Sequence, residues 1–189
     1  LDLQLNQDDL GTAVSHSSTK AGEVGDELVA FVPYQDHYML FGCVNEMWVL
    51  RSDPAAGGTL TNLSSTTGIF GSRAWCWDDK NNLYFLGTDG LYGISAASLI
   101  NSEAPRNLTK DHLPKIITDM GINRRTDRIS MAYDKQRYGV AISVVQMDAA
   151  WFANLWVDLR TGGVFPESYQ QDHTPASMIY FDSRRADRR

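Results

Sequence analysis

The residues with the clearest chemical potential form one run of carboxylates and amides, Asp78-Asp79-Lys80-Asn81-Asn82. Closely spaced oxygen ligands of this kind are what Ca²⁺ requires. Lys80 places a positive charge in the middle of the run, and no glycine followed by glutamate completes a calcium loop of the EF-hand type. The same residue types are strong turn formers. We therefore predict a β-turn and no metal site here.

Histidine and serine patterns give no catalytic signature. No two histidines lie four residues apart, and no cysteine stands near one at the spacing of a zinc site. No Gly-x-Ser-x-Gly sequence surrounds any serine, so acyl transfer is disfavoured. We predict no catalytic, cofactor-binding or metal-binding residue, no cofactor, and a protein that is not an enzyme. The histidines are His16, His37, His112 and His173.

Carboxylates from different repeats can form the acid pair of a propeller glycosidase, so spacing alone does not exclude that activity. The candidates in this chain follow strands or stand in turns, where acids are common, and we expect each to have a structural role. They are Asp36, Asp78, Asp127 and Asp158. The two cysteines, Cys43 and Cys76, stand in apolar runs typical of buried free thiols, although neighbouring strands at the right separation would allow a disulfide.

Charge limits the class of partner. The 189-residue chain has a net charge of −6 and a sequence pI of about 5.1, so general attraction to nucleic acid or anionic membranes is not expected. No apolar run is long enough to span a bilayer.

A basic tail, residues 184–189, is expected to be a solvated end. The lack of an initiator Met and the end at Arg189 suggest a piece of a longer polypeptide.

A repeat of about 45 residues organises the chain. The segments 36–50 and 81–94 each contain an apolar run, a short turn and a second apolar run. Tyr38 aligns with Leu83 and Gly42 with Gly87 at a spacing of 45, and a one-residue deletion then aligns Trp48 with Tyr92 and Leu50 with Ile94 at a spacing of 44. A further apolar run precedes each hairpin (27–32 and 72–77), and the linker 58–63 supplies a fourth strand. This is the period of a four-stranded propeller blade.

Later parts of the chain extend the pattern. A looser third copy runs through 128–133, 138–145 and 154–159, with a turn at Thr161-Gly162-Gly163 before Val164, and 178–181 begins a fourth copy. One short helical insertion is expected near 110–120, capped by Thr109 and ended by Gly121.

The strands are apolar on both faces, since Tyr38 and Leu40 point one way and Met39 and Phe41 the other. Blades stacked around an axis bury both sides of their inner strands. We predict an all-β, β-propeller-like fold of four-stranded antiparallel blades, with a β-sandwich as the structural alternative. The expected division is an N-terminal segment, 1–24, belonging to a preceding blade, the repeats over 25–183, and the basic tail, 184–189.

Four stretches in order resemble β-propeller-type structural proteins of tailed bacteriophages and prophages. They are 48–54, 62–71, 83–92 and 158–163, within a resemblance that covers roughly 25–165. The relatives tend to have Trp after the last Gly-Gly, where this chain has Val164-Phe165. The resemblance implies a virion part at the tail, neck or hub, present in the host cytoplasm before assembly, that contacts other virion proteins and copies of itself in a ring.

Two other functions remain open from sequence. A propeller enzyme or carbohydrate-binding module would have a pocket at the central axis lined with polar side chains. A sensor or scaffold propeller of a bacterial protein would carry similar Asp-Gly-Leu-Tyr units, here residues 89–92. Membrane and direct nucleic-acid partners are not expected in any of these cases.

Overall fold

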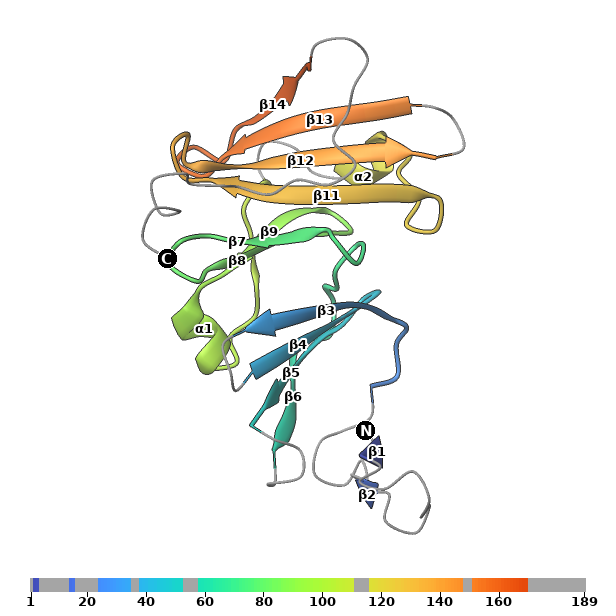
Figure 1. The fold of residues 1–189 in the computed structure, drawn as a ribbon, viewed down its shortest axis with the longest axis vertical. Helices are drawn as coiled ribbons and strands as arrows, with labels where there is room; N and C mark the ends of the chain where they lie inside the picture. Colours follow the sequence, from blue (N-terminus) through green and yellow to red (C-terminus); the bar gives the residue numbers. More distant parts are fainter. Residues whose placement is uncertain are drawn as a thin grey trace, which may run out of the picture.

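Three four-stranded antiparallel sheets make up most of the protein and stack along its long axis (Figure 1). The computed structural model describes residues 2–3, 14–15, 24–34, 38–52, 58–110, 116–147 and 151–169. Within each sheet the strands are neighbours in chain order, so each sheet is a simple meander. The prediction of an all-β chain built from repeated four-stranded sheets is confirmed, including a fourth strand from the linker after the first hairpin.

The strand bounds follow the predicted runs closely. The first sheet contains β3 (Leu28–Tyr34), β4 (Tyr38–Cys43), β5 (Met47–Arg51) and β6 (Thr59–Ser64). The second contains β7 (Trp75–Trp77), β8 (Leu83–Gly87), β9 (Gly90–Ile94) and β10 (Arg106–Asn107). The third contains β11 (Asp127–Asp134), β12 (Gly139–Gln146), β13 (Trp151–Asp158) and β14 (Val164–Glu167). A separate two-stranded sheet joins β1 (Asp2–Leu3) to β2 (Val14–Ser15). The predicted fourth copy at 178–181 and the tail 184–189 lie outside the described residues.

Strand register corrects the repeat spacing. Phe41 pairs with Trp48, and Phe85 pairs with Tyr92, so these two pairs correspond at a spacing of 44. The turns of the two hairpins correspond at the same spacing. In the first hairpin the Cys43 amide donates to the Glu46 carbonyl, and in the second Gly87 pairs with Gly90 at the equivalent positions. The spacing is therefore 44 throughout, no deletion is needed, and the alignments of Tyr38 with Leu83 and Gly42 with Gly87 are wrong by one residue. A slip of one residue in a strand moves a side chain to the opposite face.

One continuous apolar core joins the three sheets. Leu40, Phe85 and Ile142, one from each sheet, are all essentially inaccessible to solvent and belong to the same cluster. The second sheet lies between the other two (Figure 1) and contributes buried side chains from both of its faces, such as Phe85 and Leu86. Burial of both faces explains why these strands lack the alternation of polar and apolar residues seen in sheets with one wet face.

Aromatic side chains connect neighbouring sheets near the ends of their first strands. Tyr34, at the end of β3, stacks on Trp77, at the end of β7, with ring centroids 5.0 Å apart. Tyr84 stacks on Tyr133 of β11 at 6.2 Å. Beside the second pair, the Lys135 ammonium lies 2.7 Å from the Asp79 carboxylate. These contacts fix the second and third sheets against each other through both apolar and ionic groups.

Helix α1 (Ala96–Ile100) follows β9 and was not predicted from the sequence. Ser95 caps its N-terminus, because the serine hydroxyl accepts the Ser98 amide at 3.0 Å. At the other end, the Arg51 guanidinium donates to the carbonyls of Leu99 and Ile100, at 3.2 and 2.6 Å. Arg51 also bonds to the Ser102 hydroxyl. The first sheet therefore satisfies the free carbonyls at the end of this helix.

The helical insertion predicted near 110–120 is present as α2 (Ile116–Asp119), and Gly121 follows it with a positive φ of 65°. The predicted cap is wrong. Thr109 is buried, and its hydroxyl accepts the Leu91 amide of β9 at 3.0 Å. The described helix begins at Ile116, and the threonine hydroxyl binds an amide of β9 instead of a helix terminus.

The face of the first sheet that points away from the second is also apolar. Phe41, Cys43 and Trp48 form a small buried cluster on it, with Leu50 and Leu60 packed alongside. Beyond this cluster, Phe31 is 58% exposed and Met39 is 36% exposed. The expectation of two apolar faces is confirmed for this sheet, and its outer face contacts neither of the other two sheets (Figure 1).

Candidate functional site

The run 78–82, weighed above as a calcium loop, is a turn. One oxygen of the Asp78 carboxylate accepts the backbone amides of Lys80 and Asn82, both at 2.8 Å. The other accepts the Asn82 side-chain amide at 2.7 Å and the Tyr84 hydroxyl at 3.3 Å. Both oxygens are thus bound by protein donors, and the predicted β-turn is confirmed. The described residues contain no group of three or more potential metal ligands.

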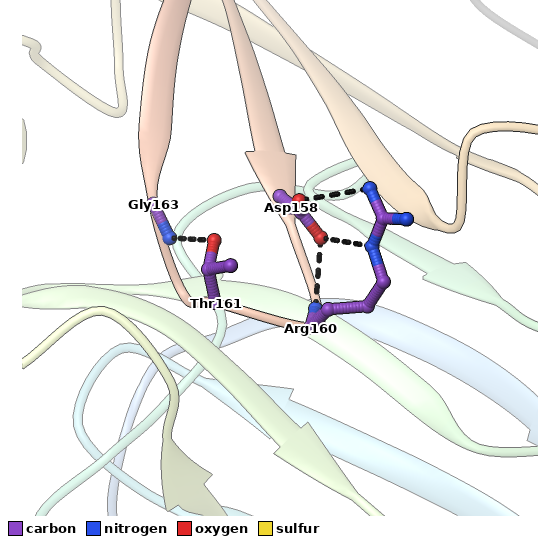
Figure 2. A network of polar contacts seen from close by, with 4 residues as sticks. All are labelled: Asp158, Arg160, Thr161 and Gly163. Atoms are coloured by element: carbon purple, nitrogen blue, oxygen red, sulfur yellow. Dashed lines mark hydrogen bonds and ion pairs between the residues drawn. The ribbon is translucent and has the colours of Figure 1, made fainter.

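Asp158 organises the turn between β13 and β14 (Figure 2). Its carboxylate accepts the Arg160 backbone amide at 2.9 Å and two guanidinium nitrogens at 3.0 Å each. The Arg160 side chain lowers the pKa of this carboxyl below its ordinary value. Thr161 accepts the Gly163 amide at 3.1 Å, and Gly162 has a φ of 70°. The turn predicted at Thr161-Gly162-Gly163 is confirmed, and glycine adopts the positive φ at Gly162 without steric cost.

Asp127 completes a third local network. Its two oxygens accept the Asn123 backbone amide at 2.7 Å and the Thr126 hydroxyl at 3.0 Å. Asp78, Asp127 and Asp158 therefore each bind donors close to them in sequence, which fits the structural role expected of them. The fourth carboxylate, Asp36, and all four histidines (His16, His37, His112 and His173) lie outside the described residues.

Both cysteines are free and buried, as the sequence favoured. Burial, with smaller contributions from Asp26 and Glu46, raises the pKa of the Cys43 thiol to about 11. Burial also raises the pKa of Cys76, and the nearby Asp78 adds to the effect. Because the thiolate is the reactive form, neither cysteine is suited to be a nucleophile near neutral pH.

A cleft of about 630 Å³ lies where the first strands of the three sheets begin. Its wall comes from the start of β3, from the loop just before β7, and from the segment that leads into β11. Each of these strands is an edge strand of its sheet, so three equivalent sheet edges meet at one place. The lining residues fall in three short segments, 27–29, 71–73 and 124–129.

Four arginines line this cleft, against two carboxylates, Glu27 and Asp127. The ion pairs among the described residues involve other arginines and a lysine. The Arg124 guanidinium lies over the Phe70 ring, 5.7 Å from its centroid, and its Nη1 is buried without a hydrogen-bond partner among the residues that the structure describes. The arginines are Arg73, Arg124, Arg125 and Arg128. We call these residues and their surroundings the arginine cleft.

Sequence reasoning did not find the arginine cleft. Three of its arginines stand within five residues, 124–128, but the stretch lacks the aromatic residues that would suggest nucleic-acid binding. Arg73 lies about fifty residues earlier in the chain. The only sequence-based expectation that pointed toward such a cleft was that a ligand-binding propeller would have a pocket at its central axis.

Comparisons with known proteins give no family for this chain. No protein-family model matches it, and no curated protein shows significant sequence similarity. In the part of the chain that the structure describes, no helix is both long and apolar enough to cross a membrane.

Proposed function

We propose that this chain is a structural module of a phage virion, at the tail, neck or hub, in which the three sheets act as blades of a propeller-like array. The array would be a rigid platform for oligomerisation and for contacts with other virion proteins. The meander order of each sheet supports the array, as does the meeting of the three first strands at one cleft. The virion assignment is supported by the resemblance of the stretches 48–54, 62–71, 83–92 and 158–163.

The outer face of the first sheet carries the proposal. At the spacing of 44, Phe31, Phe41 and Trp48 correspond to Trp75, Phe85 and Tyr92 of the second sheet. In the second sheet this aromatic row joins the core shared with the first sheet, and Phe85 is fully buried. In the first sheet, Phe41 and Trp48 are each only 8% exposed, whereas Phe31 is 58% exposed. Phe31 is thus the open part of the row, and we propose that a further β-sheet packs against it.

A second copy of the chain is the partner we propose for this row. The opposite end of the stack also presents an apolar side chain, because Phe165 of β14 is 53% exposed. The two end sheets differ in composition, since the third sheet has a row of Ser130, Ser143 and Asn154, all buried, where the first has aromatics. Contacts between unlike faces are head-to-tail, and they produce a ring when the rotation closes.

Light scattering coupled to size exclusion, together with particle images, tests the oligomer. We expect a ring of two or more chains, and we expect Phe31→Glu to shift it to monomer by placing a charge in the interface. Ile100→Glu is the matched control, because Ile100 is 46% exposed on α1, away from the end faces. A monomer for the wild-type chain, at concentrations up to about 100 μM, would contradict the oligomeric platform, since interfaces of standard size bind more tightly than this.

The virion assignment has its own test. Antibodies raised against the chain should label purified phage particles from a strain that encodes it, at the tail or neck in electron micrographs. Particles that lack the chain by mass spectrometry, while the host cells contain it, would contradict the assignment and favour a cellular scaffold or sensor.

The arginine cleft favours a second candidate, a ligand-binding propeller. Polar side chains at the meeting point of the first strands are what that function requires. Of the two carboxylates there, Asp127 is bound within its own turn, so the cleft offers positive charge more than an acid pair. A binding role suits it better than glycoside hydrolysis.

A further inference from the structure

The arginine cleft concentrates positive charge in an acidic protein. The chain has a net charge of −6, yet the lining of the cleft contains four arginines and two acids, a local excess of two positive charges. Arg73, Arg125 and Arg128 are exposed, and no ion pair among the described residues involves them. Asp127 is bound by Asn123 and Thr126. The cleft therefore keeps a net excess of positive charge.

Arg124 provides an independent indication of a ligand. Its Nη1 is buried without an acceptor among the described residues, and its guanidinium is held over the Phe70 ring. A buried donor without a partner is costly, and a charged one more so. An oxyanion in the cleft beside this guanidinium would offset its buried charge. The aromatic ring would meanwhile keep the guanidinium in place, so that little side-chain freedom is lost on binding.

We propose that the arginine cleft binds a small ligand that carries phosphate groups. A phosphate group offers close to two negative charges and three strong acceptor oxygens at one centre, which suits several guanidinium forks better than a single carboxylate does. The volume of about 630 Å³ is in the range of small-molecule sites. The apolar side chains Leu28, Val29 and Ile129 in the same wall would contact the uncharged part of the ligand. The lining of the cleft does not include Phe31, Phe41 or Trp48, the row proposed above as the oligomer contact.

Inorganic pyrophosphate is the probe for this site, measured by calorimetric titration of the whole chain. We expect saturable binding below about 1 mM at low salt, weakening as salt rises. Arg128→Gln and Arg124→Gln should each weaken binding at least about tenfold, because each removes a charge-assisted hydrogen bond. Arg106→Gln is the matched control, since Arg106 is exposed on β10 and does not line the cleft. It should change the affinity by less than about twofold.

Three results would overturn the proposal. One is no pyrophosphate binding at about 10 mM, where even a weak specific site would fill. Another is an equal loss in Arg106→Gln, which would indicate attraction to the surface as a whole. The third is equal or tighter binding of citrate or of a glutamate-rich peptide, which would assign the cleft to carboxylates or to an acidic protein segment. Circular dichroism of each variant separates lost binding from lost folding.

Discussion

Single aspartates close the hairpin turns of this protein by one repeated device. Asp78, Asp134 and Asp158 each accept the backbone amide of the residue two positions later, at 2.8, 2.8 and 2.9 Å. Such side-chain bonds mimic a backbone turn and favour these residues where a strand reverses. These aspartates therefore have a structural role. Their carboxylates act as hydrogen-bond acceptors that stabilise turns.

The turn at Asp158 gives a prediction about pH. Arg160 lowers the pKa of the Asp158 carboxyl below its ordinary value of 3.8, mainly through the side-chain hydrogen bond. A carboxyl with a lowered pKa in the folded state stabilises that state at pH values above its unfolded pKa. This contribution is lost as pH falls through the folded pKa. We expect an NMR titration to place the Asp158 midpoint below 3.8 and Arg160→Gln to raise it toward that value.

Arg106→Gln is the control for that titration, because it removes an exposed arginine of β10, whereas the donors to Asp158 described above belong to Arg160. The Asp158 midpoint should stay in place in this variant. An Asp158 midpoint unaffected by Arg160→Gln would mean that the bidentate contact in Figure 2 does not persist in solution.

The turn at residues 78–82 was predictable because turn chemistry is local, whereas the arginine cleft was not. Asp78 and its donors lie within seven residues, so their types and order carry the signal. The cleft brings Arg73 close to residues 124–128 only after two sheets have stacked. No local pattern encodes that approach.

At the scale of elements, the close contact between Gly42 of β4 and Ile69 gives a second prediction. A Cβ placed on Gly42 would lie 2.6 Å from Ile69 Cδ1, and Ile69 is fully buried. We expect Gly42→Ala to lower the free energy of unfolding by about 1–3 kcal/mol through overpacking. Urea denaturation measures the loss. Gly25→Ala is the control, since nothing lies within 4 Å of its added methyl group, and an equal loss in both variants would refute this packing argument.

Strands were predicted well because each is a run of apolar residues between turn formers, a signal contained in the strand itself. Register was predicted less well. The alignment of Gly42 with Gly87 matched two glycines, whereas the pairing of Phe41 with Trp48 and of Phe85 with Tyr92 shows the true correspondence. Helix α1 escaped prediction because it is five residues long and its end is completed by Arg51 from another sheet. Short helices depend on such tertiary contacts more than on propensity.

At the scale of the molecule, the three sheets form one structural unit because their inner faces share a core. The second sheet is buried on both faces, and the apolar cluster runs from Val32 of the first sheet to Val157 of the third. The stacked pairs Tyr34–Trp77 and Tyr84–Tyr133 reinforce the same two junctions. A sheet separated from its neighbours would expose an apolar face, so none of the three is expected to be stable alone.

This shared core predicts a single cooperative unfolding transition. Phe85→Ala, in the middle sheet, should lower the free energy of unfolding by about 3–5 kcal/mol, the usual cost of a large cavity in a core. Because the tryptophans are distributed over all three sheets, with Trp48 in the first, Trp75 in the second and Trp156 in the third, their fluorescence reports on each one. Fluorescence and far-UV circular dichroism should therefore change together in urea, in the wild type and in the variant. Ile100→Ala, on the exposed side of α1, should shift the midpoint little. Two separated transitions, with only one of them moved by Phe85→Ala, would mean that the sheets fold as independent units and that the stack is held by something weaker than a common core.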